Sequence, residues 1–160
     1  MKPFKEIKKW FENQENLFYL FLIILIVPNV VLCFTEPMPI VAKVCNVLLP
    51  FSIYYIVMSW SRNCGRTFWI LFPFLFFGAF QIVLLYLFGQ SIIAVDMFLN
   101  LVTTNSSEAL ELLDNLIPAI VIVVLLYIPA LAVATVSVIK KRELPELFIH
   151  RERKRARLAM

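Results

Sequence analysis

Long uncharged segments alternate with short charged ones along this chain. Four segments contain no Asp, Glu, Lys, Arg or His: residues 16–35, 44–61, 67–95 and 115–139. A helix needs about 20 mostly apolar residues to cross the hydrocarbon core of a bilayer, and each segment is close to that length or longer. The pattern predicts four membrane-spanning helices, at about residues 17–35, 44–61, 67–89 and 116–139.

The apolar segments are continuous runs, whereas the strands of a membrane barrel show alternating polar and apolar positions. Lipid offers no hydrogen-bond partners to the backbone, so helices must satisfy these groups internally. The first apolar run exceeds the usual length of a signal-peptide core, and no small-residue cleavage site follows it. We therefore expect an all-α integral membrane protein whose first span is a retained anchor.

Composition agrees with a chain that is solvated by lipid. The hydrophobic set makes up 61% of the residues and charged residues only 16%, against about 45–50% and about 25% in soluble domains. The three cysteines provide neither a disulfide scaffold nor the ligand spacing of a zinc site. A disulfide between Cys33 and Cys45 stays open, although small apolar core residues are the simpler interpretation.

The basic residues predict the orientation of the chain. Four Lys lie in the N-terminal segment, two Arg lie between the second and third spans, and eight Lys and Arg lie in the C-terminal tail. Lys43 is the one basic residue on the opposite side. The positive-inside rule therefore predicts four crossings with both termini cytoplasmic.

Both flanks of the predicted membrane domain are basic. Residues 1–15 form an interfacial segment in which Phe4, Ile7 and Phe11 recur at helical spacing. The alternative is a flexible flank that serves only as a topology signal. Residues 140–160 form a cytoplasmic basic tail. A topology signal and contact with anionic lipid explain its charge, so we do not expect a nucleic-acid partner.

The predicted spans contain few polar residues, and none of these is ionisable. The absence of a carboxylate in mid-span weighs against a proton-coupled transporter. Asn29, Asn46 and Gln81 are better explained as hydrogen-bond partners between helices than as ligand sites. Four prolines are expected to kink or locally unwind the helices: Pro28, Pro50, Pro73 and Pro129.

The outer segment, residues 90–115, contains four polar residues at intervals of four: Asp96, Asn100, Thr104 and Glu108. On a helix they would form one stripe, because successive members turn only about 40° around the axis. The carboxylate would attract the ammonium group of a zwitterionic lipid, while the amide and hydroxyl would bind its phosphate. In the alternative interpretation Asn105 is the N-cap of the fourth helix and Glu108 completes a capping box. The two interpretations are compatible.

The pattern Asn100-x-x-x-Thr104-Asn105-x-x-Glu108-Ala109, preceded by Asp96-Met97, resembles a motif of the sulfatase-like phosphoethanolamine transferases. Those enzymes modify lipid A or the lipopolysaccharide core. The order of elements is also similar: a basic N-terminus, three spans, the motif and a fourth span. The resemblance covers roughly residues 4–141, although its specific part is about fifteen residues long.

This resemblance implies a membrane domain in the bacterial inner membrane that helps to bind phosphatidylethanolamine at its periplasmic face. Asn100, Thr104 and Glu108 would contact the donor, with a weaker contribution from Asp96. The acceptor would be lipid A, a core glycolipid or another envelope glycan. The family's threonine nucleophile and zinc ligands belong to a periplasmic sulfatase-like domain that this sequence lacks.

The sequence is truncated relative to the family's five-helix membrane domain. We expect no catalytic residues and no cofactor within this chain, with zinc expected only in the catalytic domain, and we expect the chain to be inactive alone. The alternative function is a stand-alone four-helix membrane protein that assembles or stabilises a partner without catalysis.

Overall fold

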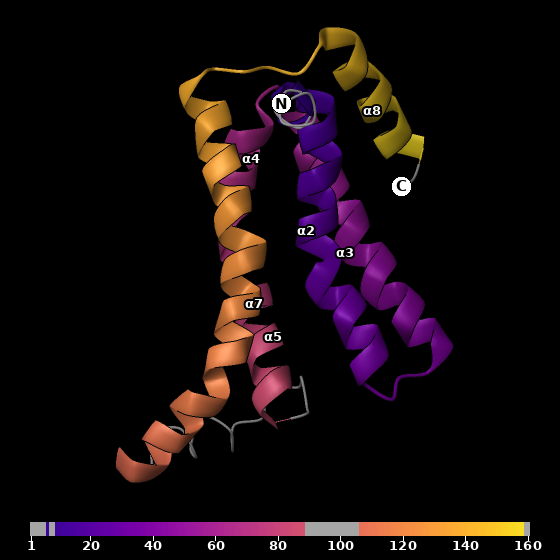
Figure 1. Ribbon diagram of the computed structural model, residues 1–160. Helices are drawn as coiled ribbons and strands as arrows, with labels where there is room; N and C mark the ends of the chain where they lie inside the picture. The colour runs from indigo at the N-terminus through magenta and orange to yellow at the C-terminus, as the bar shows by residue number, and fades with distance from the viewer. Residues whose placement is uncertain (1–5, 7–8, 89–105, 159–160) are drawn as a thin grey trace.

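The computed structural model describes residue 6 and residues 9–88 and 106–158, and the regular structure in these ranges is entirely helical. The helices are α2 (Gln14–Thr35), α3 (Ile40–Trp60), α4 (Cys64–Ile70), α5 (Phe72–Phe88), α7 (Ser106–Ile139) and α8 (Glu146–Leu158). Figure 1 shows α2, α3, α5 and α7 running lengthwise through the molecule, with α8 at the end where α2 begins. We call this end the α8 end.

Three helices in the described part of the chain are long and apolar enough to cross a membrane: Gln14–Thr35, Ile40–Trp60 and Ile120–Ile139. They correspond to the first, second and fourth spans expected from the sequence. Large apolar side chains on their surfaces are exposed, including Ile40 at 80% and Leu125 at 69%. Such surfaces are costly in water but match the hydrocarbon of a bilayer.

The third expected span, residues 67–89, is divided between α4 and α5. The break lies at Leu71, where the backbone leaves helical geometry with φ −81° and ψ 2°. Pro73 explains it, because proline lacks the N–H that the carbonyl of Trp69 would accept and its ring clashes with that carbonyl. The helix restarts at once, with the amides of Phe74 and Leu75 both donating to the carbonyl of Leu71. By contrast, Pro28, Pro50 and Pro129 lie within continuous helices.

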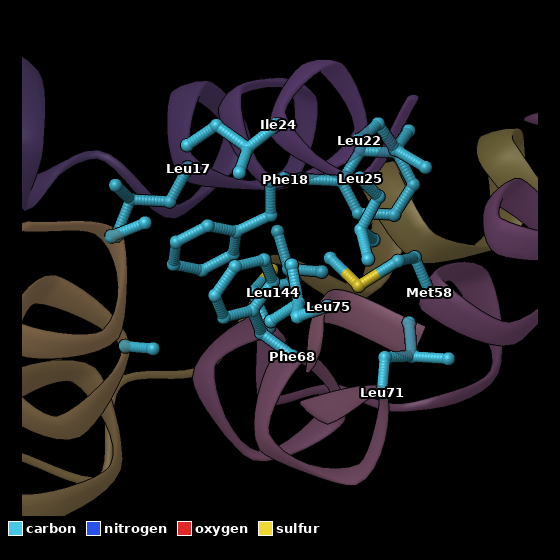
Figure 2. Packing of buried hydrophobic residues seen from close by; sticks show 14 of the residues in the cluster. Leu17, Phe18, Leu22, Ile24, Leu25, Met58, Phe68, Leu71, Leu75 and Leu144 are labelled. Carbon is cyan, nitrogen blue, oxygen red and sulfur yellow. The ribbon is translucent and has the colours of Figure 1, made fainter. Parts of the chain in front are cut away.

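The hydrophobic core is concentrated toward the α8 end. Figure 2 shows apolar side chains of α2 facing those of α4 and α5, with Met58 of α3 and Leu144 beside them. Phe21 of α2 stacks on Phe68 of α4, with ring centroids 4.3 Å apart. The core thus joins the start of the chain to the segment that follows α7.

Small and polar residues bring α4 against α2 and α7 at the same end. A Cβ on Gly65 would lie 2.3 Å from the carbonyl oxygen of Ala134, so only glycine permits this approach. Nearby, the buried hydroxyl of Ser137 donates to Gln14 Oε1 at 2.7 Å. Close packing of small residues and interhelical hydrogen bonds are the usual means by which helices associate in lipid.

The chain reverses after α7 through a left-handed turn. Lys141 has φ 47°, and the amides of Lys141 and Arg142 donate to the carbonyls of Val138 and Ser137. This is the pattern of a Schellman C-cap, which usually has glycine at the left-handed position. The turn directs residues 142–145 back across the α8 end of the bundle, where α8 begins.

Candidate functional site

The residues of the outer polar stripe cannot be placed together from the structure. Asp96, Asn100 and Thr104 lie outside the described residues. Glu108 lies in the first turn of α7, and the placement of its side chain is not described. Asn105, the expected N-cap of the fourth helix, also lies outside the described residues, which resume within α7 at Ser106. The contacts of the cap and of the stripe remain predictions.

The expectation that polar residues of the spans bond between helices is confirmed for Asn29 and Asn46, which pair with each other, whereas the side chain of Gln81 is outside the described part. Asn29 Nδ2 donates to Asn46 Oδ1 at 3.2 Å, and Asn46 Nδ2 donates to the carbonyl of Asn29 at 2.9 Å. Asn46 Nδ2 also lies 3.5 Å from the sulfur of Cys33. Cys33 and Cys45 are both free thiols. These contacts join α2 to α3 and leave little hydrogen-bonding capacity for a ligand.

The most unusual polar cluster lies where α8 packs against α2 and α3. The loop between α3 and α4 positions the segment that precedes α8. Asn63 Nδ2 donates to the carbonyl of Arg142 at 3.0 Å, and the amide of Leu144 donates to the carbonyl of Arg62 at 2.8 Å. Asn63 also caps α4 through its Oδ1, which accepts from the amide of Arg66 at 2.9 Å. One side chain therefore fixes both α4 and the approach to α8.

Glu152 is at the centre of this cluster, with only 1% of its surface exposed. Tyr55 of α3 donates its hydroxyl to Glu152 Oε2. Arg151 Nε and Arg155 Nη1 each donate to Glu152 Oε1 at 3.0 Å. A buried carboxylate is costly unless it is paired and hydrogen-bonded, and both oxygens of Glu152 are satisfied.

The ionised state of Glu152 is favoured by these contacts. Burial opposes ionisation, but the hydrogen bonds from Tyr55 and Arg151 and the charge of Arg155 outweigh it and hold the pKa of Glu152 below its ordinary value. Glu152 is therefore a carboxylate at neutral pH. It is saturated by its partners, so its chemistry is that of an anchor for α8 rather than of an acid or base.

Aromatic packing completes the attachment of α8. Phe148 makes edge-on contacts with Phe18 and Tyr19 of α2, with ring centroids 5.5 and 5.9 Å apart. The guanidinium of Arg151 lies over the Phe148 ring, 5.1 Å from its centroid. Such a cation–π contact adds roughly 0.5–1 kcal/mol at an exposed site.

Arg153 joins α8 to the last turn of α3. Its Nε donates to the carbonyl of Ser59 at 3.0 Å and its Nη2 to the carbonyl of Trp60 at 2.6 Å. The last carbonyls of a helix have no partners within it, and a cation is favourable at its negative end. Arg153 therefore caps α3 with a side chain from a segment 93 residues away.

Sequence reasoning missed Glu152, because it is the one acid in a strongly basic run. The spacing of residues along α8 could nevertheless have indicated that Glu152 is buried. Phe148, Glu152 and Ala156 are four residues apart and lie on one face of α8, and all three are buried. An acidic residue on the buried face of a basic amphipathic helix indicates a specific partner across the interface.

Among the residues that the structure describes, no three His, Cys, Asp or Glu side chains come together in a way that could hold a metal ion. Comparisons with known proteins add no further assignment. No family model matches the chain, and neither the curated proteins nor the solved structures give a significant match.

Proposed function

We propose that the chain is the membrane domain of a phosphoethanolamine transferase, which anchors the enzyme in the bacterial inner membrane and helps to bind its phosphatidylethanolamine donor. The observation that carries this proposal is the motif from Asn100 to Ala109, which leads into α7 at Ser106. The motif places an amide, a hydroxyl and a carboxylate just before or within the first turn of a helix that continues as a membrane span. Lipid A or another envelope glycan would be the acceptor.

Four crossings fit the packing of the helices. Gly65 contacts α7 at Ala134, whereas Gly78 lies beside Pro28 of α2 and Tyr127 of α7. Along α4 and α5 the partners on α7 therefore come progressively earlier in the sequence, which means that this segment runs antiparallel to α7. Residues 64–88 would cover about 37 Å at 1.5 Å per residue, enough to cross the hydrocarbon core despite the break at Leu71.

The charges favour a cytoplasmic location for the α8 end. This end holds the start of α2, the end of α3, the start of α4 and the end of α7, together with α8. Basic residues gather there, in the loop between α3 and α4, in α4, after α7 and on α8: Arg62, Arg66, Lys140, Lys141, Arg142, Arg151, Arg153, Lys154, Arg155 and Arg157. The positive-inside rule then puts the start of α7, and with it the motif, on the periplasmic side.

The chemistry of the motif suits an ethanolamine phospholipid. A carboxylate attracts the ammonium group, and amide and hydroxyl donors bind the phosphate oxygens. The positive end of the α7 dipole adds a further attraction for phosphate. The catalytic step itself would belong to a sulfatase-like domain, as the resemblance implies. The role of the membrane domain is to hold donor and catalytic domain together at the bilayer surface.

Competition between lipids tests this proposal. The chain, purified with bound lipid, is mixed with equal amounts of phosphatidylethanolamine and phosphatidylglycerol, and retained lipids are counted by native mass spectrometry. We expect preferential retention of phosphatidylethanolamine. Asn100→Ala and Glu108→Gln should each reduce that preference about tenfold, because a hydrogen bond to a charged group contributes roughly 1.5–3 kcal/mol.

Asp114→Asn is the matched control, since it removes one negative charge from the same helix outside the motif. Asp114 lies six residues beyond Glu108, which places it about 120° away around the helix axis. The Asp114→Asn variant should prefer phosphatidylethanolamine over phosphatidylglycerol as strongly as the parent chain does. Unchanged phosphatidylethanolamine retention in both motif variants would contradict donor binding and would favour the partner-assembly function instead.

A further inference from the structure

A second candidate site lies at the α8 end, away from the motif. A groove of about 370 Å³ lies between the last turns of α3 and the C-terminal half of α8. Six residues line it: Ile56, Ser59, Trp60, Arg153, Ala156 and Arg157. Ser59 and Ala156 are buried, whereas Trp60 is 76% exposed. The groove thus has a closed floor and one large aromatic side chain at its edge.

Two arginines give the groove its charge. The guanidinium of Arg153 is held in place by the carbonyls of Ser59 and Trp60, and a guanidinium has five N–H donors, so donors remain. Arg157 is exposed and has no hydrogen bond or ion pair with another residue that the structure describes. The nearest acid on α8, Glu152, is already saturated by Tyr55 and other arginines. No acidic side chain in the part of the chain that the structure describes forms an ion pair with either arginine of the groove.

The apolar side of the groove continues along a membrane-spanning helix. Ile56 lies one turn before Trp60 on α3, and large apolar side chains farther along α3 are exposed, including Leu49 at 61%. Tryptophan is enriched where a span meets the membrane interface. A ligand with an anionic head and a long apolar tail would therefore find partners for both ends, whereas a nucleic acid or an acidic peptide would leave the apolar part unused.

We propose that this groove binds an anionic phospholipid, with its phosphate at Arg153 and Arg157 and an acyl chain along α3 past Ile56. Arginine suits the headgroup because it is always positively charged and donates hydrogen bonds to phosphate oxygens. The bound lipid would bridge α3 and α8 and add to the attachment that Glu152 provides. This site does not depend on the proposed donor binding, which concerns the other end of the bundle and a zwitterionic lipid.

Trp60 provides a local probe of the lipid in the groove. Trp10→Phe and Trp69→Phe leave Trp60 as the single tryptophan of the chain. This protein is reconstituted into mixed vesicles of phosphatidylcholine and phosphatidylglycerol, in which either one lipid or the other carries brominated acyl chains. At the same mole fraction, brominated phosphatidylglycerol should quench Trp60 fluorescence more strongly than brominated phosphatidylcholine.

The variants identify the groove as the source of this preference. Arg157→Gln should lower the preference about fivefold, the contribution of one basic residue beside an anionic surface. Lys154→Gln removes the same charge from the same helix outside the groove and should leave the preference unchanged. Arg157→Lys keeps the charge and should retain most of the preference. Circular dichroism should give the same helix content for all of these proteins.

Two results would overturn the proposal. The first is equal quenching of Trp60 by both brominated lipids in the parent protein. The second is an equal loss of preference in Arg157→Gln and Lys154→Gln, which would indicate attraction to the basic surface in general. If Arg157→Gln loses helix content, Arg157→Lys tests the phosphate site instead. Loss of the phosphatidylglycerol preference in Arg157→Lys, which retains the positive charge, would contradict this site.

Discussion

Glu152 shows how one buried charge can fix the position of a whole helix. Its carboxylate contacts Tyr55 of α3 and two arginines of its own helix, and it is almost completely enclosed. Removal of one partner from a buried charged group costs more than the loss of one hydrogen bond, since the remaining groups lose their compensation. The attachment of α8 therefore depends on Glu152 more than on any exposed ion pair, such as the one between Arg62 and Glu146.

Glu152→Ala is expected to destabilise the packing of α8 on α3 by about 3 kcal/mol. The hydroxyl of Tyr55 and the guanidinium groups of Arg151 and Arg155 would lose their acceptor. Hydrogen exchange of the α8 amides in detergent or nanodiscs measures this change. Glu143→Ala is the control, because Glu143 is an exposed acid in the segment before α8. Equal exchange in both variants would show that the aromatic packing of Phe148 suffices.

The same attachment should depend on pH in a defined direction. The pKa of Glu152 is held below its ordinary value in the folded protein, so its contribution is fully present above the unfolded pKa of about 4.3. The contribution is lost as the pH falls through the lower folded value. Protection of α8 should therefore be constant from pH 7 to pH 5 and decrease below about pH 4. A decrease already between pH 7 and pH 5 would contradict the direction of the shift.

Some contacts of individual residues could be predicted from the sequence, whereas others could not. The pairing of Asn29 with Asn46 follows from two amides inside apolar spans, where each needs a partner. The position of Glu152 does not follow in the same way. It depends on the left-handed turn at Lys141, and lysine at that position gives no sequence signal of the kind that glycine would.

At the scale of elements, α2, α3 and α7 agree with the apolar runs because length and hydrophobicity dominate helix formation in lipid. The break between α4 and α5 has a visible cause in Pro73. Other prolines in equally apolar runs do not divide their helices, so which proline interrupts a helix depends on tertiary packing. The return of α8 onto α2 and α3 could not be predicted, since a basic amphipathic segment pairs equally well with a membrane surface.

The junction of α4 and α7 leads to a prediction about packing. Gly65→Ala is expected to destabilise the protein by about 1–3 kcal/mol, because the new methyl group would meet the backbone carbonyl of Ala134, which cannot rotate away. Unfolding by SDS, followed by circular dichroism, measures the loss. Gly78→Ala is the comparison: its methyl would meet the side chain of Pro28 at 2.8 Å, so a smaller loss is expected. A larger loss at Gly78 would indicate that the centre of the bundle is the tighter contact.

At the scale of the whole molecule, the two ends of the helical bundle are proposed to bind different lipids. Basic residues gather at the α8 end, where α8 packs against α3, whereas α7 begins at the other end. In the proposed topology α4 and α5 together form the third of four crossings. The count of four is expected from the lengths of the apolar runs together with the distribution of basic residues, and the antiparallel packing of α4 and α5 against α7 is compatible with it.

Thiol labelling in intact cells tests this arrangement most directly. Cysteine is introduced at Ser107 in the motif or at His150 on α8, and a membrane-impermeant maleimide is added before and after the inner membrane is opened. The parent chain, with its three cysteines, gives the background. We expect labelling at position 107 as soon as the reagent reaches the periplasm, and labelling at position 150 only after the inner membrane is opened. Labelling of both positions from the same side would contradict it.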